Sequence, residues 1–173
     1  MPNREYTADD FPALDVDAYL RERQDMFFGS RGANPESIAS SIAEGALTLG
    51  ARRTMVTKNH GWWFVCADID WLQVPTVEGV DEQSVFDGLC AFPEAGINWH
   101  RSEVMIRVFS DQAFSASGER IFRVKDGSLS DDEVLQMVAE LGSWDRVVGF
   151  HFTAANSEFS VAGCGRLRPL LRN

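Results

Sequence analysis

The chain has 173 residues, which is enough for one domain with a substantial apolar core. Its 26 acidic and 16 basic residues give a formal net charge of −10, which argues against a nucleic-acid binder held by phosphate contacts. The acidity fits a basic protein partner, although solubility alone also explains it. We expect a single domain over residues 1–173.

A short helix is predicted over residues 15–28, with Asp15 or Asp17 as its N-cap. A loop follows, and the next helix has a clear beginning, because Asn34 can accept backbone N–H groups and Pro35 suits the first helical position. Its inward stripe is mostly small, so we expect this helix to lie close to a sheet. The stripe comprises Ile38, Ile42, Ala46 and Leu49, with Ala39, Ala43 and Leu47 beside it.

The clearest hairpin signal lies in residues 52–68, where two β-rich runs flank the turn at 59–61. Trp62 and Trp63 are consecutive in the second run, so their side chains point to opposite faces of the sheet. Both can be buried only if both faces are covered.

The second half of the chain predicts further elements of both types, which together indicate an α+β fold. We expect a two-layer sandwich, in which helices cover one face of a mixed β-sheet. The elements are a helix over 80–92, an ambiguous segment over 101–112, a hairpin over 113–127, a helix opened by a capping box from Ser130 to Glu133, a central strand over 145–154 and a further strand over 158–163, followed by a basic tail.

The segment LRERQDMFFG, residues 20–29, resembles the V-R-x-R-P-G-M-Y-I-G segment of the N-terminal ATPase domains of DNA gyrase and topoisomerase IV. A short loop, a helix and a hairpin follow in the same order as in that family. Residues 97–127 are similar to its later helix and hairpin. The resemblance spans about residues 17–127 and implies the Bergerat, or GHKL, sandwich fold.

The ATPase chemistry of that family needs an Asn that coordinates magnesium, a Glu that activates water and an Asp that binds adenine. In the ungapped register these positions are Ser41, Ser37 and Asp68. Ile69 and Trp71 replace the glycines that admit the base, and the Gly-rich phosphate loop is missing. The resemblance therefore implies a degenerate scaffold without ATPase activity, cofactor or metal, since fold and function separate readily.

We expect a non-catalytic module that binds another protein, in the way that small acidic bacterial immunity proteins and inhibitors cover a basic toxin. Opposite charges would speed association with such a partner, and an exposed Trp would anchor it. The expected partner-binding surface consists of acidic residues beside an exposed tryptophan: Asp68, Asp70, Trp71, Glu78, Asp81 and Glu82.

Two alternatives remain open. The first is a small-molecule or nucleotide-binding protein that uses the residual ATP cleft, with Asp68 contacting the base. The second is mimicry of DNA, which would require carboxylates in phosphate-like rows, and the sequence has no long acidic run.

Other reactive residues favour structural roles. His60, His100 and His151 have no metal-ligand spacing. The Ser37, Ser40 and Ser41 series is better explained by close helix packing than by nucleophilic catalysis, since no His or Lys lies nearby in the sequence.

The setting is expected to be cytoplasmic. The N-terminal stretch has no apolar segment of a signal peptide, and no run approaches the about 20 apolar residues of a membrane span. Cys66, Cys90 and Cys164 form no C-x-x-C pair, so they indicate free thiols and not a zinc site or a disulfide framework.

Overall fold

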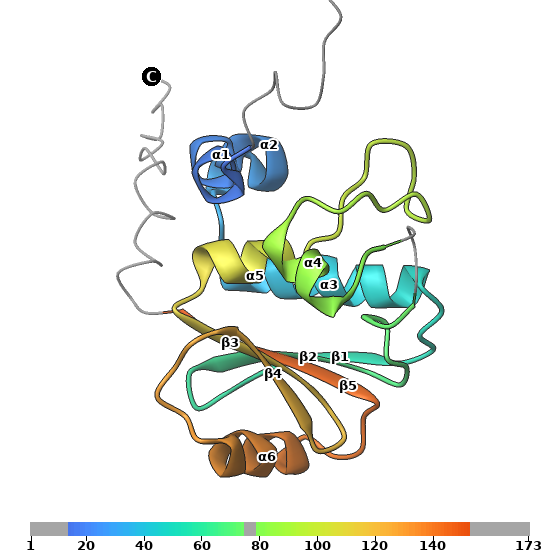
Figure 1. Cartoon of the computed structure of the whole chain (residues 1–173), viewed down its shortest axis with the longest axis vertical. Helices are drawn as coiled ribbons and strands as arrows, with labels where there is room; N and C mark the ends of the chain where they lie inside the picture. Colours follow the sequence, from blue (N-terminus) through green and yellow to red (C-terminus); the bar gives the residue numbers. More distant parts are fainter. Residues whose placement is uncertain (1–13, 75–78, 153–173) are drawn as a thin grey trace, which may run out of the picture.

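The computed structural model describes residues 14–74 and 79–152 (Figure 1). Its elements confirm the α+β class. The helices are α1 (Val16–Glu22), α2 (Gln24–Phe28), the 3-10 turn η2 (Gly29–Arg31), α3 (Pro35–Thr48), α4 (Glu82–Asp87), α5 (Val104–Phe109) and α6 (Asp131–Glu140). The strands are β1 (Thr54–Asn59), β2 (Trp62–Ala67), β3 (Gln112–Ser117), β4 (Arg120–Lys125) and β5 (Arg146–His151).

The five strands form one open sheet in the order β1-β2-β5-β3-β4. Every pairing is antiparallel, so the prediction of a mixed sheet is wrong. The reason is that β5 enters between the two hairpins and runs opposite to both of its neighbours. Its central position confirms the prediction made from its continuous apolar run.

Both hairpins form as expected. In the first, His60 and Gly61 have φ values of 50° and 84°, and a two-residue hairpin turn with positive φ at both positions matches the twist of the flanking strands. Residues 101–112, whose apolar residues fit both the helical and the strand period, contain α5 and the beginning of β3.

Helices cover both faces of the sheet, so the prediction of helices on one face is wrong. Figure 1 shows α6 on the face opposite to α3 and α5. The two neighbouring tryptophans follow this division, because Trp62 belongs to the buried cluster that contains Val134 of α6, whereas Trp63 packs against the cluster that contains α3. The requirement that both faces be covered is therefore met, although Trp63 is only half-buried.

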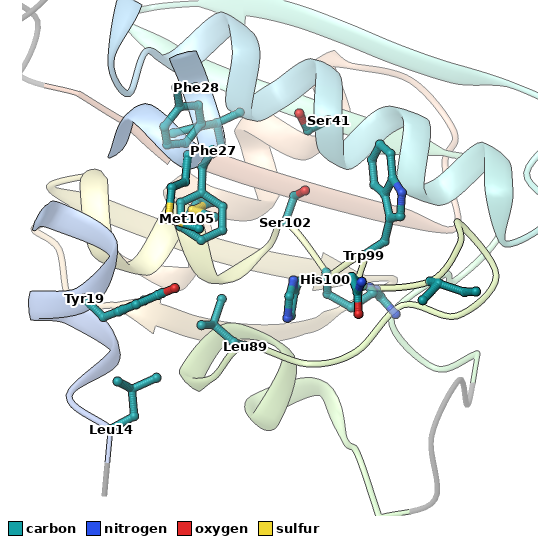
Figure 2. A pocket seen from close by; sticks show the side chains of 15 residues that line it. Leu14, Tyr19, Phe27, Phe28, Ser41, Leu89, Trp99, His100, Ser102 and Met105 are labelled. Carbon is teal, nitrogen blue, oxygen red and sulfur yellow. The ribbon is translucent and has the colours of Figure 1, made fainter. Parts of the chain in front are cut away.

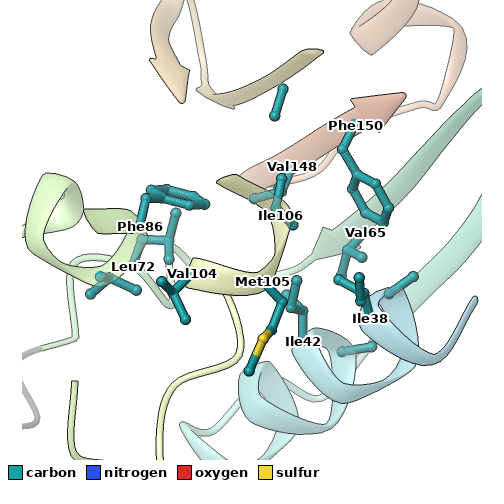
Figure 3. Packing of buried hydrophobic residues seen from close by; sticks show 14 of the residues in the cluster. Ile38, Ile42, Val65, Leu72, Phe86, Val104, Met105, Ile106, Val148 and Phe150 are labelled. Atoms are coloured by element: carbon teal, nitrogen blue, oxygen red, sulfur yellow. The ribbon is translucent and has the colours of Figure 1, made fainter. Parts of the chain in front are cut away.

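The larger core lies between the sheet and α3, α4 and α5 (Figure 3). The prediction that small residues bring α3 close to the sheet is confirmed, because Ala39 and Ala46 are fully buried there. Asn34 caps this helix by accepting a hydrogen bond from the Ser37 N–H at 2.8 Å, as expected. The other buried members of the stripe are Ile38, Ile42 and Ala43.

Several predicted boundaries change. The predicted helix over 15–28 is two short helices, α1 and α2, that meet at Arg23, whose φ of −113° is not helical. Asp15, and not Asp17, caps the first of them by accepting a hydrogen bond from the Ala18 N–H at 3.0 Å. The strand predicted over 158–163 and the basic tail lie outside the described residues.

Candidate functional site

Two residues of the expected partner surface, Trp71 and Glu82, are buried inside the protein. Trp71 is completely buried and donates its indole N–H to Oε1 of Glu103 at 3.0 Å, so its predicted role as an exposed anchor is wrong. Glu82 is only 4% exposed, which excludes it from a contact surface. Glu78 lies outside the described residues.

Asp70 and Glu82 are held by one buried guanidinium, that of Arg146 in β5. Arg146 donates two hydrogen bonds to the Asp70 carboxylate, at 2.8 and 2.7 Å, and one to Oε1 of Glu82 at 2.6 Å. It also donates to the Ser115 hydroxyl at 2.7 Å, and Arg120 reaches the other oxygen of Glu82 at 2.8 Å. A buried charge must be paired and hydrogen-bonded in this way, so these two carboxylates have a structural role.

The remaining two predicted acids organise the backbone near them. Asp68 accepts the N–H groups of Arg53 and Arg52 at 3.1 and 2.9 Å, and these hydrogen bonds lower the pKa of its carboxyl. Asp81 is the N-cap of α4, and hydrogen bonds from the Ser84 hydroxyl and N–H lower its pKa in the same way. Both carboxylates therefore hold the backbone of their own local turns.

An apolar groove lies on the α3 side of the molecule, with a volume of about 760 Å³ (Figure 2). We call it the Trp99 groove. In Figure 2, Tyr19, Phe27 and Met105 lie on one side of it, and Trp99 and His100 lie on the other. Its lining residues come from α1, α2, α3, α5 and the segment before α5: Leu14, Tyr19, Met26, Phe27, Phe28, Ile38, Ser41, Leu89, Ile97, Asn98, Trp99, His100, Arg101, Ser102 and Met105.

The groove has an unusually exposed apolar rim. Ile97 is 91% exposed and Trp99 is 60% exposed, and exposed apolar side chains that cluster in this way are less common than single ones. Trp99 is therefore the exposed tryptophan that the sequence could not single out among the five of the chain. Ser41, at the position of the magnesium-binding Asn, lines the groove, whereas Asp68 does not.

A buried ion pair supports the wall of the groove beneath its rim. Arg101, which is 2% exposed, donates two hydrogen bonds to the Glu103 carboxylate, at 3.2 and 2.6 Å, and its guanidinium also lies over the Phe92 ring. The same carboxylate accepts the hydrogen bond from Trp71. This pairing fixes the segment before α5 and neutralises the only guanidinium among the lining residues.

The hydroxyl-rich face of α3 lines a second cleft, of about 630 Å³, together with Trp63. Ser40 and Ser41 are exposed, so the explanation that they pack the helix closely is wrong for these two residues. The alanines on the other side of α3 provide that contact instead.

The face of the sheet opposite to the groove carries the acidic helix α6, although exposed acids such as Glu44 and Glu119 lie elsewhere. Residues 126–145, which include α6, contain six carboxylates and no basic residue, and all six are exposed. A cleft of about 350 Å³ lies between α6 and the first hairpin. Its lining residues are His60, Trp62, Leu129, Glu133, Gln136, Met137 and Glu140. We call residues 126–145, together with the residues that line this cleft, the α6 surface.

Two carboxylates of this cleft are fixed in position. Glu133 accepts the Ser130 N–H at 2.7 Å in the capping box that the sequence predicts, and this hydrogen bond is the main cause of its lowered pKa. Glu140 accepts a hydrogen bond from the Asn59 side chain at 3.4 Å. The cleft thus places anionic oxygen atoms beside the apolar surfaces of Trp62 and Met137.

Neither described thiol is an activated nucleophile, and the described residues contain no metal-binding cluster. Burial raises the pKa of Cys66 to about 12, and burial also raises the pKa of the half-buried Cys90, so neither thiol is activated as a nucleophile. Residues 14–74 and 79–152 contain no group of three or more His, Cys, Asp or Glu side chains that could hold a metal ion. No helix in these ranges has the length and hydropathy needed to cross a membrane.

The sequence analysis predicted neither the α6 surface nor the Trp99 groove, and the sequence contains a signal only for the first. For the α6 surface it was the absence of any Lys or Arg over residues 126–145, which contain the short acidic run Asp131-Asp132-Glu133. For the Trp99 groove there was no comparable signal, because its walls come from five segments that only the fold brings together. No family model, curated protein or solved structure matches this chain, so the resemblance to GHKL ATPases stays a prediction.

Proposed function

We propose that the protein is a non-catalytic binding module that recognises a basic protein partner through the α6 surface, as an inhibitor or immunity protein would. The observation that carries the proposal is the set of four exposed carboxylates on α6, those of Asp131, Asp132, Glu133 and Glu140, of which Asp131 is paired with Arg123. These acids belong to a helix that lies on its own face of the sheet (Figure 1).

The cleft of the α6 surface suits a long basic side chain. Lys and Arg have an apolar stem and a charged head, and they bind best where the stem meets apolar surface and the head meets carboxylate oxygen. Trp62 and Met137 offer the apolar contact, while Glu133 and Glu140 offer the oxygen atoms. Because the Glu133 carboxylate is already held by the capping box, it would lose little side-chain freedom on binding.

A non-catalytic role is supported by the groups that stand at the ATPase positions. Ser37 and Ser41 supply neither a carboxylate base nor an amide ligand, and Asp68 is occupied by two backbone N–H groups. Trp71 fills part of the core beyond it. We place the protein in the cytoplasm as part of the same proposal, since its described cysteines are free thiols.

The test compares two double variants that change the net charge equally. Asp132→Lys with Glu140→Lys alters the α6 surface, and Glu44→Lys with Glu119→Lys alters exposed acids elsewhere. Affinity capture from the native host, with the wild type as bait, should recover one stoichiometric basic protein. The α6 double variant should bind that protein at least about ten-fold more weakly, and the control double variant within about two-fold of wild type.

Salt dependence completes the test. Association of the wild type with the captured protein should slow steeply as ionic strength rises, because the steering charges are exposed and screened. Equal binding by the two double variants, or the absence of any stoichiometric partner, would overturn the proposal.

A further inference from the structure

We propose that the Trp99 groove is a binding site for a small amphipathic molecule with an apolar, ring-sized body and an uncharged, hydrogen-bonding head. This inference is independent of the proposed function, since the groove lies on the other face of the sheet and shares no residue with the α6 surface.

The size and the walls of the groove fit a small ligand. Ligand sites typically enclose about 300–1,000 Å³, are lined mainly by apolar and aromatic side chains, and contain a few polar groups that orient the ligand. The groove, at about 760 Å³, falls within this range. Its walls come from five separate segments, so they surround the space on several sides, which a flat docking face for a protein does not do.

The rim gives a reason for the groove to be filled. Among the described residues, six large apolar side chains are exposed, and four of them line this one groove: Leu14, Met26, Ile97 and Trp99. Exposed apolar area is costly in water, and contiguous patches mark binding sites more often than single side chains do. A ligand in the groove would remove part of this rim from water.

The charge of the lining selects the head of the ligand. None of the described lining residues is Asp or Glu, although the chain as a whole carries a net charge of −10. The Arg101 guanidinium is neutralised by Glu103, which leaves hydroxyl groups, an amide and the His100 imidazole to meet the head. A cationic head would find no carboxylate among these groups and an anionic head no unpaired cation, whereas an uncharged oxygen can accept hydrogen bonds from the hydroxyls of Tyr19 and Ser102 (Figure 2).

Binding can be measured with N-phenyl-1-naphthylamine, an uncharged dye whose fluorescence rises when it leaves water. Wild-type full-length protein should give saturable binding with one dye per chain. Ser41→Trp should weaken it at least about ten-fold, because Ser41 is exposed on α3 and lines the groove, so a large ring there fills the space.

Ser40→Trp is the matched control. Ser40 is the neighbouring exposed serine of the same helix and lines the second cleft but not the groove, so this variant should bind the dye within about two-fold of wild type. Circular dichroism and urea unfolding of both variants establish that they fold alike. Equal loss in the two variants, equal retention in the two, or a dye signal that does not saturate would overturn the site.

Competition tests the charge of the head. Three displacing ligands share one naphthalene body: 1-naphthylacetate, 1-naphthylmethanol and 1-naphthylmethylammonium. The alcohol should displace the dye at concentrations at least about ten-fold lower than either ion does, because an unpaired charge is costly to bury. Equal potency of either ion would overturn the predicted selectivity for an uncharged head.

Discussion

On the α3 side of the sheet, the buried layer combines apolar side chains with ion pairs, and an open groove remains at its edge. On the α6 side, the buried layer contains only apolar side chains and a close glycine contact, and the charges stay outside in the α6 surface. All buried charged side chains of the described residues, namely Glu82, Arg101, Glu103 and Arg146, belong to the α3 side. The two faces of the sheet therefore differ in chemistry: buried ion pairs lie on the α3 side, and exposed carboxylates lie on the α6 side.

The largest expected effect on stability comes from removing the central arginine of the buried ion pairs on the α3 side. Arg146→Met should lower the free energy of unfolding by about 3–5 kcal/mol, since it leaves two carboxylates without their central partner. Urea unfolding measures the change. Arg120→Met removes the 62% exposed partner of Glu82 and should cost less than about 1 kcal/mol. Similar losses in the two variants would contradict the structural role of Arg146.

On the α6 side, the corresponding destabilising change is a steric one. A Cβ atom at Gly149 would lie 2.5 Å from Cζ of Phe114, so Gly149→Ala should destabilise the protein by about 1–3 kcal/mol through overpacking. Gly88→Ala is the control, because its nearest contact would be 3.7 Å away, and it should change stability by less than about 0.5 kcal/mol. If Gly149→Ala is also neutral in urea unfolding, the close contact with Phe114 does not matter for stability.

A smaller effect concerns the capping box that begins α6. Ser130→Ala should cost about 1 kcal/mol at neutral pH, because the Glu133 N–H loses its acceptor. Since the pKa of Glu133 is lowered in the folded protein, its contribution is present above its ordinary value of 4.5 and is lost as the pH falls through the lower folded-state value. The stability difference between wild type and Ser130→Ala should therefore narrow on acidification, and urea unfolding at neutral and acidic pH measures it. A difference that stays constant with pH would contradict this coupling.

The smallest expected effect on stability is that of Trp99→Ala, which should nevertheless strongly weaken binding of the dye. Trp99→Ala removes a 60% exposed side chain at the groove rim, so it should change the free energy of unfolding by less than about 0.5 kcal/mol. The same variant should bind the naphthylamine dye at least about ten-fold more weakly, because exposed tryptophans dominate contacts of this kind. A strong loss of stability would mean that Trp99 is part of the core and not of a site.

The elements with local signals were predictable. The hairpins, the α3 cap and the Ser130 capping box each depend on a few neighbouring residues, and the structure contains all of them. Three features were not predictable, because they depend on contacts between distant segments: the placement of α6 on the second face, the burial of Trp71 against Glu103, and the union of Asp70 with Arg146. An acidic residue in a loop looks the same in the sequence whether it faces water or a buried arginine.

The central position of β5 has a consequence for how the chain folds during synthesis. The two hairpins are complete before residue 126, yet they are joined to each other only through β5, which begins at Arg146. Until β5 is available for pairing, β2 and β3 each lack a neighbouring strand, and such unpaired edges invite association between chains. We expect the sheet to close in one late step when β5 pairs, and a chain truncated before Arg146 to be far more sensitive to protease than one that includes His151.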